Sequence, residues 1–208
     1  MSETESWCEM RDRSGREAPD EDRGEAPAEA CSEARAQTHG AASGAACGEM
    51  SESVRRAIAE MAERSLTLAC AESLTGGALC SAFVEISGAS AVLRGSVTAY
   101  AVDLKASILG VDGELLRTKG PVEERVALDM ARGACRLLGA DVALATTGVA
   151  GPGPADGHAA GTVWVACAGK LGERARLRRF SGGRSNVRAR AVEAAVDLLA
   201  ELLCMTPR

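Results

Sequence analysis

Apolar residues recur with two different periods along residues 51–203, and the alternation of these periods predicts an α/β fold. Short apolar runs are typical of buried strands, whereas apolar positions three and four residues apart are typical of amphipathic helices. The chain is predicted to form strands at 66–71, 92–101, 141–147, 161–168 and 174–180. The helical spacing predicts helices at 51–64, 76–86, 103–109, 112–116, 121–137 and 184–204. We therefore expect a three-layer α/β/α sandwich with a mixed, mostly parallel sheet, whose final two strands are antiparallel.

Residues 1–50 have a different composition from the rest of the chain. They contain 12 acidic and 5 basic residues, and they show neither a helical nor a strand period. Such a segment buries too little apolar surface to offset the entropy of an ordered chain. We expect a disordered acidic tail at 1–50, which solubilises the protein or binds a partner, followed by one folded domain at 51–208.

The composition of the domain excludes several classes of function. Its 17 acidic and 19 basic residues nearly cancel, and only 2% of the chain is aromatic, which argues against a nucleic-acid surface. No window approaches the roughly 18 apolar residues of a membrane span, and the acidic N-terminus does not resemble a secretory signal. No two of the eight cysteines have Cys-x-x-Cys spacing, which argues against a zinc site. We therefore expect a cytoplasmic protein that needs no metal or organic cofactor.

A serine, a tyrosine and a lysine lie within sixteen residues, at Ser90, Tyr100 and Lys105. Serine is a weak nucleophile that needs a base, and a lysine with a lowered pKa is the base in known Ser-Lys variants of the serine triad. This spacing alone also fits an ordinary strand with a solvated edge. The stretch is thus a candidate amide-hydrolysing site that uses neither histidine nor metal.

Three flanking features resemble ligand-binding elements, and each also has a plainer interpretation. The turn from Ser73 to Gly77 follows an apolar run and precedes a helix, a geometry that presents backbone N–H groups to an anion. The Gly/Pro-rich segment 147–154 follows another predicted strand, where ligands commonly bind in open sheets. Arg184 begins the last predicted helix and adds charge to a helix N-terminus. An ordinary capped turn, a simple loop and a solvated arginine explain the same three patterns.

Several motifs together resemble the C-terminal domain of the competence/damage-inducible CinA family over about 51–203. The matching segments are Ala71-Glu72-Ser73-Leu74-Thr75-Gly76-Gly77, Gly88-Ala89-Ser90, Val97-Thr98-Ala99-Tyr100 with Lys105, Thr147-Gly148-Val149-Ala150-Gly151-Pro152-Gly153, and Gly161-Thr162-Val163-Trp164. The resemblance implies a nicotinamide-nucleotide amidase, which converts nicotinamide mononucleotide and water to nicotinate mononucleotide and ammonia. It also implies a homodimer, and it places the catalytic serine, tyrosine and lysine at Ser90, Tyr100 and Lys105.

The turn, the loop and the helix start together supply the expected substrate contacts. The substrate-binding candidates are Ser73, Thr75, Gly76, Gly77, Thr147, Gly148, Gly151, Gly153 and Arg184. The chain departs from the family at Ala101-Val102, where Ser-Asn is usual, and at Leu74, where Cys is usual. This departure keeps two alternatives open: a non-catalytic nucleotide-binding or competence-associated protein with the same fold, and an amidase for another small amide.

Overall fold

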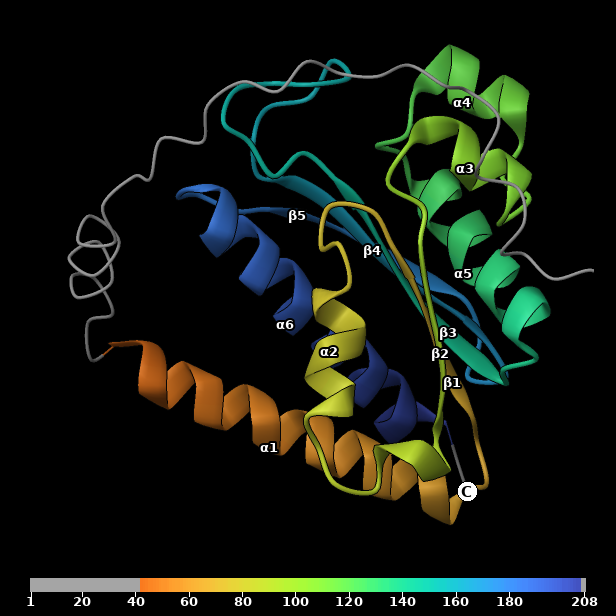
Figure 1. The fold of residues 1–208 in the computed structure, drawn as a ribbon, viewed down its shortest axis with the longest axis vertical. Coiled ribbons are helices and arrows are strands. Elements are labelled where there is room, and N and C mark those ends of the chain that lie inside the picture. Colours follow the sequence, from red (N-terminus) through yellow and green to blue (C-terminus); the bar gives the residue numbers. More distant parts are fainter. Residues whose placement is uncertain (1–41, 207–208) are drawn as a thin grey trace, which may run out of the picture. The chain divides into compact units, whose positions relative to one another are not determined.

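The computed structural model describes residues 42–206, and these residues are built around one five-stranded sheet (Figure 1). The strands are β1 (Leu68–Glu72), β2 (Leu93–Thr98), β3 (Val142–Gly148), β4 (Thr162–Gly169) and β5 (Arg174–Arg179). Their order across the sheet is β2-β1-β3-β4-β5. β1 pairs in parallel with β2 and β3, whereas β4 is antiparallel to both β3 and β5. The mixed sheet and the antiparallel final pair are therefore confirmed.

Helices cover both faces of the sheet and complete the expected sandwich. They are α1 (Ala42–Glu63), α2 (Ala78–Val84), α3 (Val102–Ser107), α4 (Gly113–Lys119), α5 (Glu124–Leu138) and α6 (Arg184–Met205), with a short 3-10 helix, η2 (Ala89–Ala91). α1, α2 and α6 lie on one face, and α3, α4 and α5 lie on the other (Figure 1). No helix within residues 42–206 combines the length and the apolar character that crossing a bilayer requires.

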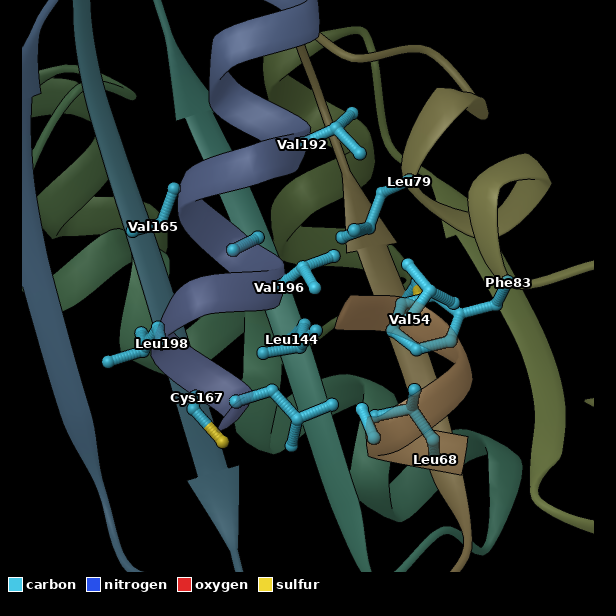
Figure 2. Packing of buried hydrophobic residues seen from close by; sticks show 14 of the residues in the cluster. Val54, Leu68, Leu79, Phe83, Leu144, Val165, Cys167, Val192, Val196 and Leu198 are labelled. Atoms are coloured by element: carbon cyan, nitrogen blue, oxygen red, sulfur yellow. The ribbon is translucent and has the colours of Figure 1, made fainter. Parts of the chain in front are cut away.

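Alternation along the strands divides the core into two hydrophobic clusters, because successive side chains point to opposite faces of a sheet. In β1, Leu68 and Cys70 face the α6 side, whereas Ala69 and Ala71 face the α5 side. Figure 2 shows the first cluster, in which side chains from β3 and β4 pack against those of α6. The branched side chains of the strands point to this face. Their alanines point to the other face, where they allow α5 to pack close to the sheet.

Several boundaries differ from the expected ones, two of them at α1 and β2. Helix α1 begins at Ala42 rather than at residue 51. Residues 42–50 contain three alanines, and alanine is the strongest helix former. Strand β2 ends at Thr98 rather than at 101, because extended backbone at Ala101 leads directly into α3. Disorder was expected over residues 1–50, but residues 42–50 form the start of α1, and residues 1–41 lie outside the described residues.

Candidate active site

A pocket of about 240 Å³ lies at the carboxyl ends of the three parallel strands. Ser73 follows β1, Tyr100 follows β2, and Gly148 ends β3, so parallel pairing brings these residues to one edge of the sheet. Lys105 on α3 and Arg184 on α6 also line the pocket. This edge is where ligands bind in open α/β sheets.

Lys105 is the buried cationic group of the site. Its side chain is 1% exposed, and its Nζ donates hydrogen bonds to Ser73 Oγ at 2.9 Å and to the Ala99 carbonyl at 2.7 Å. Burial lowers the pKa of Lys105 from 10.5 to about 8, although the negative charge of Asp156 partly opposes this shift. The amine therefore loses its proton around pH 8 while it contacts a serine hydroxyl.

The backbone around Ser73 is held on two sides. Its N–H donates to the Thr146 carbonyl of β3 at 3.0 Å, which continues the β1–β3 pairing by one residue. From α6, Arg188 donates to the Leu74 carbonyl at 3.0 Å and to the Thr75 carbonyl at 2.5 Å. The Ser73 hydroxyl is consequently fixed in front of the Lys105 amine.

The turn after Ser73 binds an anion, but that anion belongs to the protein. The buried carboxylate of Glu72 accepts hydrogen bonds from the N–H groups of Gly77 (2.9 Å), Leu79 (3.0 Å) and Cys80 (2.9 Å), and from Ser96 Oγ (3.1 Å). The start of α2 is thus already neutralised by Glu72. This corrects the expectation of a substrate-binding turn.

Thr75, Gly76 and Gly77 have structural positions instead. The Thr75 hydroxyl is buried against the Thr146 hydroxyl at 2.7 Å, and the two glycines adopt φ of 60° and 95° where the chain reverses into α2. None of the three lines the pocket, whereas Ser73 does. The Thr-Gly-Gly sequence therefore shapes the turn that presents Ser73.

The Gly/Pro-rich segment lines the pocket. Thr147 Oγ1 donates to the Pro121 carbonyl at 2.7 Å, which connects the end of β3 to the segment before α5. Gly148 has a φ of 155°, and a Cβ there would lie 2.4 Å from the Thr162 carbonyl oxygen, so only glycine fits. Gly151 and Gly153 lie farther along the same wall.

Arg184 and Tyr100 meet at the rim of the pocket. The Arg184 guanidinium donates to the Gly151 carbonyl at 2.9 Å and to Tyr100 Oη at 3.0 Å. Tyr100 is 60% exposed, so the phenol faces the pocket mouth rather than the core. Arg184 therefore joins Tyr100 to the Gly/Pro segment at this rim.

Ser90 lies apart from the other two expected catalytic residues. It is an exposed residue of η2, before the first residue of β2, and it lines a different hollow that includes Arg94. Tyr100 and Lys105 come after β2, so the length of this six-residue strand separates them from Ser90 by roughly 20 Å at about 3.3 Å per residue. Figure 1 shows the segment before β2 and α3 at opposite ends of the sheet. The serine that contacts Lys105 is Ser73.

Two features of the site were missed in the sequence. Ser73 was assigned to substrate binding, although a serine at a tight strand-to-helix turn is a familiar position for a nucleophile. Asp156 lines the pocket from the loop between β3 and β4, and the Asp-Gly dipeptide in the sequence is a hairpin signal that could have indicated its turn.

Across the described residues, no group of three or more His, Cys, Asp or Glu side chains is placed to hold a metal ion.

Proteins similar to this chain carry related names. A CinA-like protein of Frankia casuarinae is 45% identical over 147 residues, which cover 71% of this chain and 34% of that protein. A CinA-like protein of Geobacter sulfurreducens is 42% identical over 138 residues, or 66% of this chain and 33% of that protein. The chain thus spans about a third of the length of these curated relatives.

Solved structures match both the fold and the sequence. The competence/damage inducible protein CihA of Agrobacterium tumefaciens has a TM-score of 0.72 and 36% identity, covering 74% of this chain and 96% of that one. A CinA superfamily protein of Klebsiella pneumoniae has a TM-score of 0.72 and 34% identity, covering 76% and 99%. The family model described as the CinA C-terminal domain matches residues 51–203. This chain therefore belongs to the CinA C-terminal domain family.

Proposed function

We propose that this protein is an amide hydrolase that deamidates nicotinamide mononucleotide, with Ser73 as nucleophile and Lys105 as general base. One observation carries the proposal: a buried lysine amine with a pKa of about 8 lies 2.9 Å from a serine hydroxyl in a pocket. A Ser-Lys pair of this kind is an established variant of the serine triad. The choice of substrate rests on the family resemblance and on the arginine at the pocket rim.

The first half of the reaction forms an acyl-enzyme. Neutral Lys105 accepts the hydroxyl proton of Ser73 while Oγ bonds to the carboxamide carbon and the carbonyl electrons move to oxygen. The loop Ala150–Gly153 lines the same pocket, and the backbone N–H groups of its non-proline residues are the proposed donors to that oxyanion. The Lys105 ammonium then protonates the amide nitrogen, the C–N bond breaks, and ammonia leaves.

The second half repeats these steps with water. Lys105, neutral again, takes a proton from a water molecule as its oxygen adds to the acyl carbon. When this intermediate collapses, the bond to Ser73 Oγ breaks and Lys105 returns the proton to the serine. The products are nicotinate mononucleotide and ammonia, so every atom of substrate and water is accounted for.

Tyr100 and Arg184 are proposed to bind the substrate at the pocket rim. The Arg184 guanidinium lies at the first residue of α6, and a helix N-terminus with an arginine favours a phosphate group. The Tyr100 ring is exposed at the pocket mouth, where an aromatic face suits stacking on a pyridine ring. This arrangement supports Tyr100 as a contact to the substrate rather than as the partner of Lys105.

A non-catalytic binding protein is the main rival, because Ala101-Val102 replaces the family's usual Ser-Asn. Ala101 is the N-cap of α3 and makes no side-chain cap, so a serine there would add a cap rather than a catalytic group. Val102 lines the pocket and changes one wall residue. Neither residue takes part in the Ser73–Lys105 contact, which supports the enzyme over the rival. Ammonia release from nicotinamide mononucleotide by the purified chain tests this choice directly, and no release above a buffer control would favour the rival.

The proposed base predicts the pH dependence of catalysis. Only neutral Lys105 accepts a proton, and its pKa is about 8, so kcat/KM should rise with pH through about 8 and fall roughly tenfold per unit below it. Ammonia release should be measured between pH 7 and 9.5, above the second phosphate pKa of about 6. A profile that is flat over this range would contradict Lys105 as the base.

Replacement of Arg184 by alanine should weaken recognition of the phosphate. Charge-assisted hydrogen bonds to an ionised group contribute about 1.5–3 kcal/mol each, so kcat/KM for the mononucleotide should fall roughly 10- to 100-fold. The rate with nicotinamide riboside, which lacks the phosphate, should change little. Arg179→Ala is a matched control, because it removes an arginine from the outermost strand. Equal losses on both substrates would give Arg184 a structural role instead.

A further inference from the structure

Asp156 is held over the pocket by a tight hairpin turn. Ala155 and His158 exchange both backbone hydrogen bonds, at 3.0 and 2.9 Å. Between them, Asp156 and Gly157 have φ of 52° and 76°, the left-handed pair typical of a type I′ turn. A Cβ on Gly120 would lie 3.9 Å from the Asp156 Cβ, so the turn tip lies beside the segment that precedes Pro121. Asp156 therefore has a defined place in the pocket wall.

The pocket is lined by more cationic than acidic side chains. Among the described residues that line it, Asp156 is the one acidic side chain, and Lys105 and Arg184 are the cationic ones. Arg184 already donates to Gly151 and Tyr100 at the rim. The field of Asp156 reaches Lys105, because this carboxylate raises the pKa of the amine against the effect of burial.

The reactive form of the proposed enzyme changes this balance. When Lys105 loses its proton, the pocket that Asp156 also lines loses one positive charge. A cationic group on the substrate would then restore an opposite charge near the carboxylate. The pyridinium ring of nicotinamide mononucleotide carries such a charge within the same ring that bears the carboxamide.

We propose that Asp156 is a specificity-determining residue that makes this pocket select amides on a cationic aromatic ring over amides on a neutral ring. The inference rests on the proposed amidase function and deepens it, since it concerns the same pocket. It assigns the negative charge of Asp156 to the ring, Arg184 to the phosphate, and the Ser73–Lys105 pair to the carboxamide.

Asp156→Asn isolates the charge from the shape of the turn. Asparagine is favoured in the left-handed position of a type I′ turn, and it retains the ability to hydrogen-bond a sugar hydroxyl. Asp197→Asn is the matched control, because it removes the same charge from an exposed position thirteen residues along α6 from Arg184. At 1.5 Å per residue, that site is roughly 20 Å away from Arg184.

Binding should be measured by calorimetry on full-length Ser73→Ala protein, in which the ligand is not consumed. The probes are nicotinamide mononucleotide and benzamide ribonucleotide, which has the same shape but a neutral ring. With Asp156→Asn added, the Kd of the pyridinium ligand should rise about three- to tenfold. This is the effect expected of one charge pair that is partly exposed to solvent. The Kd of the neutral ligand should stay unchanged, and Asp197→Asn should alter neither.

Equal weakening of both ligands would overturn the proposal, because it would assign Asp156 to the shared ribose or amide. An unchanged Kd for the pyridinium ligand would overturn it as well. Failure of the amidase function is detected separately, by ammonia release from the wild-type chain. A wild-type chain that selects the cationic ring in binding but releases no ammonia would refute the reaction and retain the inference about Asp156.

Discussion

Replacement of Ser73 by alanine is expected to lower ammonia release from nicotinamide mononucleotide by roughly 10⁴-fold or more, since loss of a serine nucleophile removes the covalent route. The hydroxyl that Lys105 contacts at 2.9 Å disappears, whereas the backbone bond from Ser73 to Thr146 remains. Substrate binding and thermal melting should therefore change little. Turnover is measured by coupled ammonia detection, binding by calorimetry, and the fold by circular dichroism during heating.

Ser90→Ala provides the matched control for this experiment. Ser90 is exposed at the opposite end of β2, so its removal should leave kcat and KM within about twofold of the wild-type values. The two serine variants together decide between the nucleophile suggested by the motif spacing and the one suggested by the geometry. Loss of activity in Ser90→Ala, with activity retained in Ser73→Ala, would identify Ser90 as the nucleophile instead.

Replacement of Lys105 by arginine is expected to be nearly as damaging as replacement by methionine, with kcat lowered by about 10³-fold or more in both. Arginine keeps the positive charge but does not deprotonate in proteins, so it supplies no base. Methionine keeps an apolar stem in a site that is 1% exposed, and it removes a desolvated cation. Its loss of the hydrogen bond to Ala99 is offset by that relief, so the melting temperature should stay within a few degrees.

Lys119→Arg is the control for the lysine variants. Lys119 is exposed in the last turn of α4, where either cation interacts favourably with the helix end, so activity should be retained. An active Lys105→Arg enzyme would show that the residue acts only through its positive charge. In that case the rise of kcat/KM through pH 8 should also be absent.

The architecture was predictable because local patterns and tertiary contacts agree. Short apolar runs became β1, β3 and β4, and the two final strands are close enough in sequence to pair antiparallel. The pairing of β1 with β2 and β3 then places whatever follows these strands at one edge. Tyr100, Lys105, Arg184 and the segment 147–153 accordingly line one pocket.

The choice of serine was settled only by the tertiary structure. Ser90 is closer than Ser73 to Lys105 along the chain, but β2 intervenes and carries the chain across the sheet from one edge to the other. Ser73 is 32 residues from Lys105, yet parallel pairing brings the end of β1 beside the chain that leaves β2. Sequence distance thus misleads whenever a strand separates two residues.

The ligand of the glycine turn was likewise decided by tertiary packing. The turn residues and the helix that follows them were enough to show that the start of α2 has backbone N–H groups that favour an anion. The sequence did not show that the side chain of Glu72 turns back from the end of β1 to accept them. A buried carboxylate needs such partners because burial without hydrogen bonds is costly, and the turn provides them. The sequence therefore determined which chemical groups this protein has at the edge of its sheet, and the pairing of the strands decided which of those groups meet.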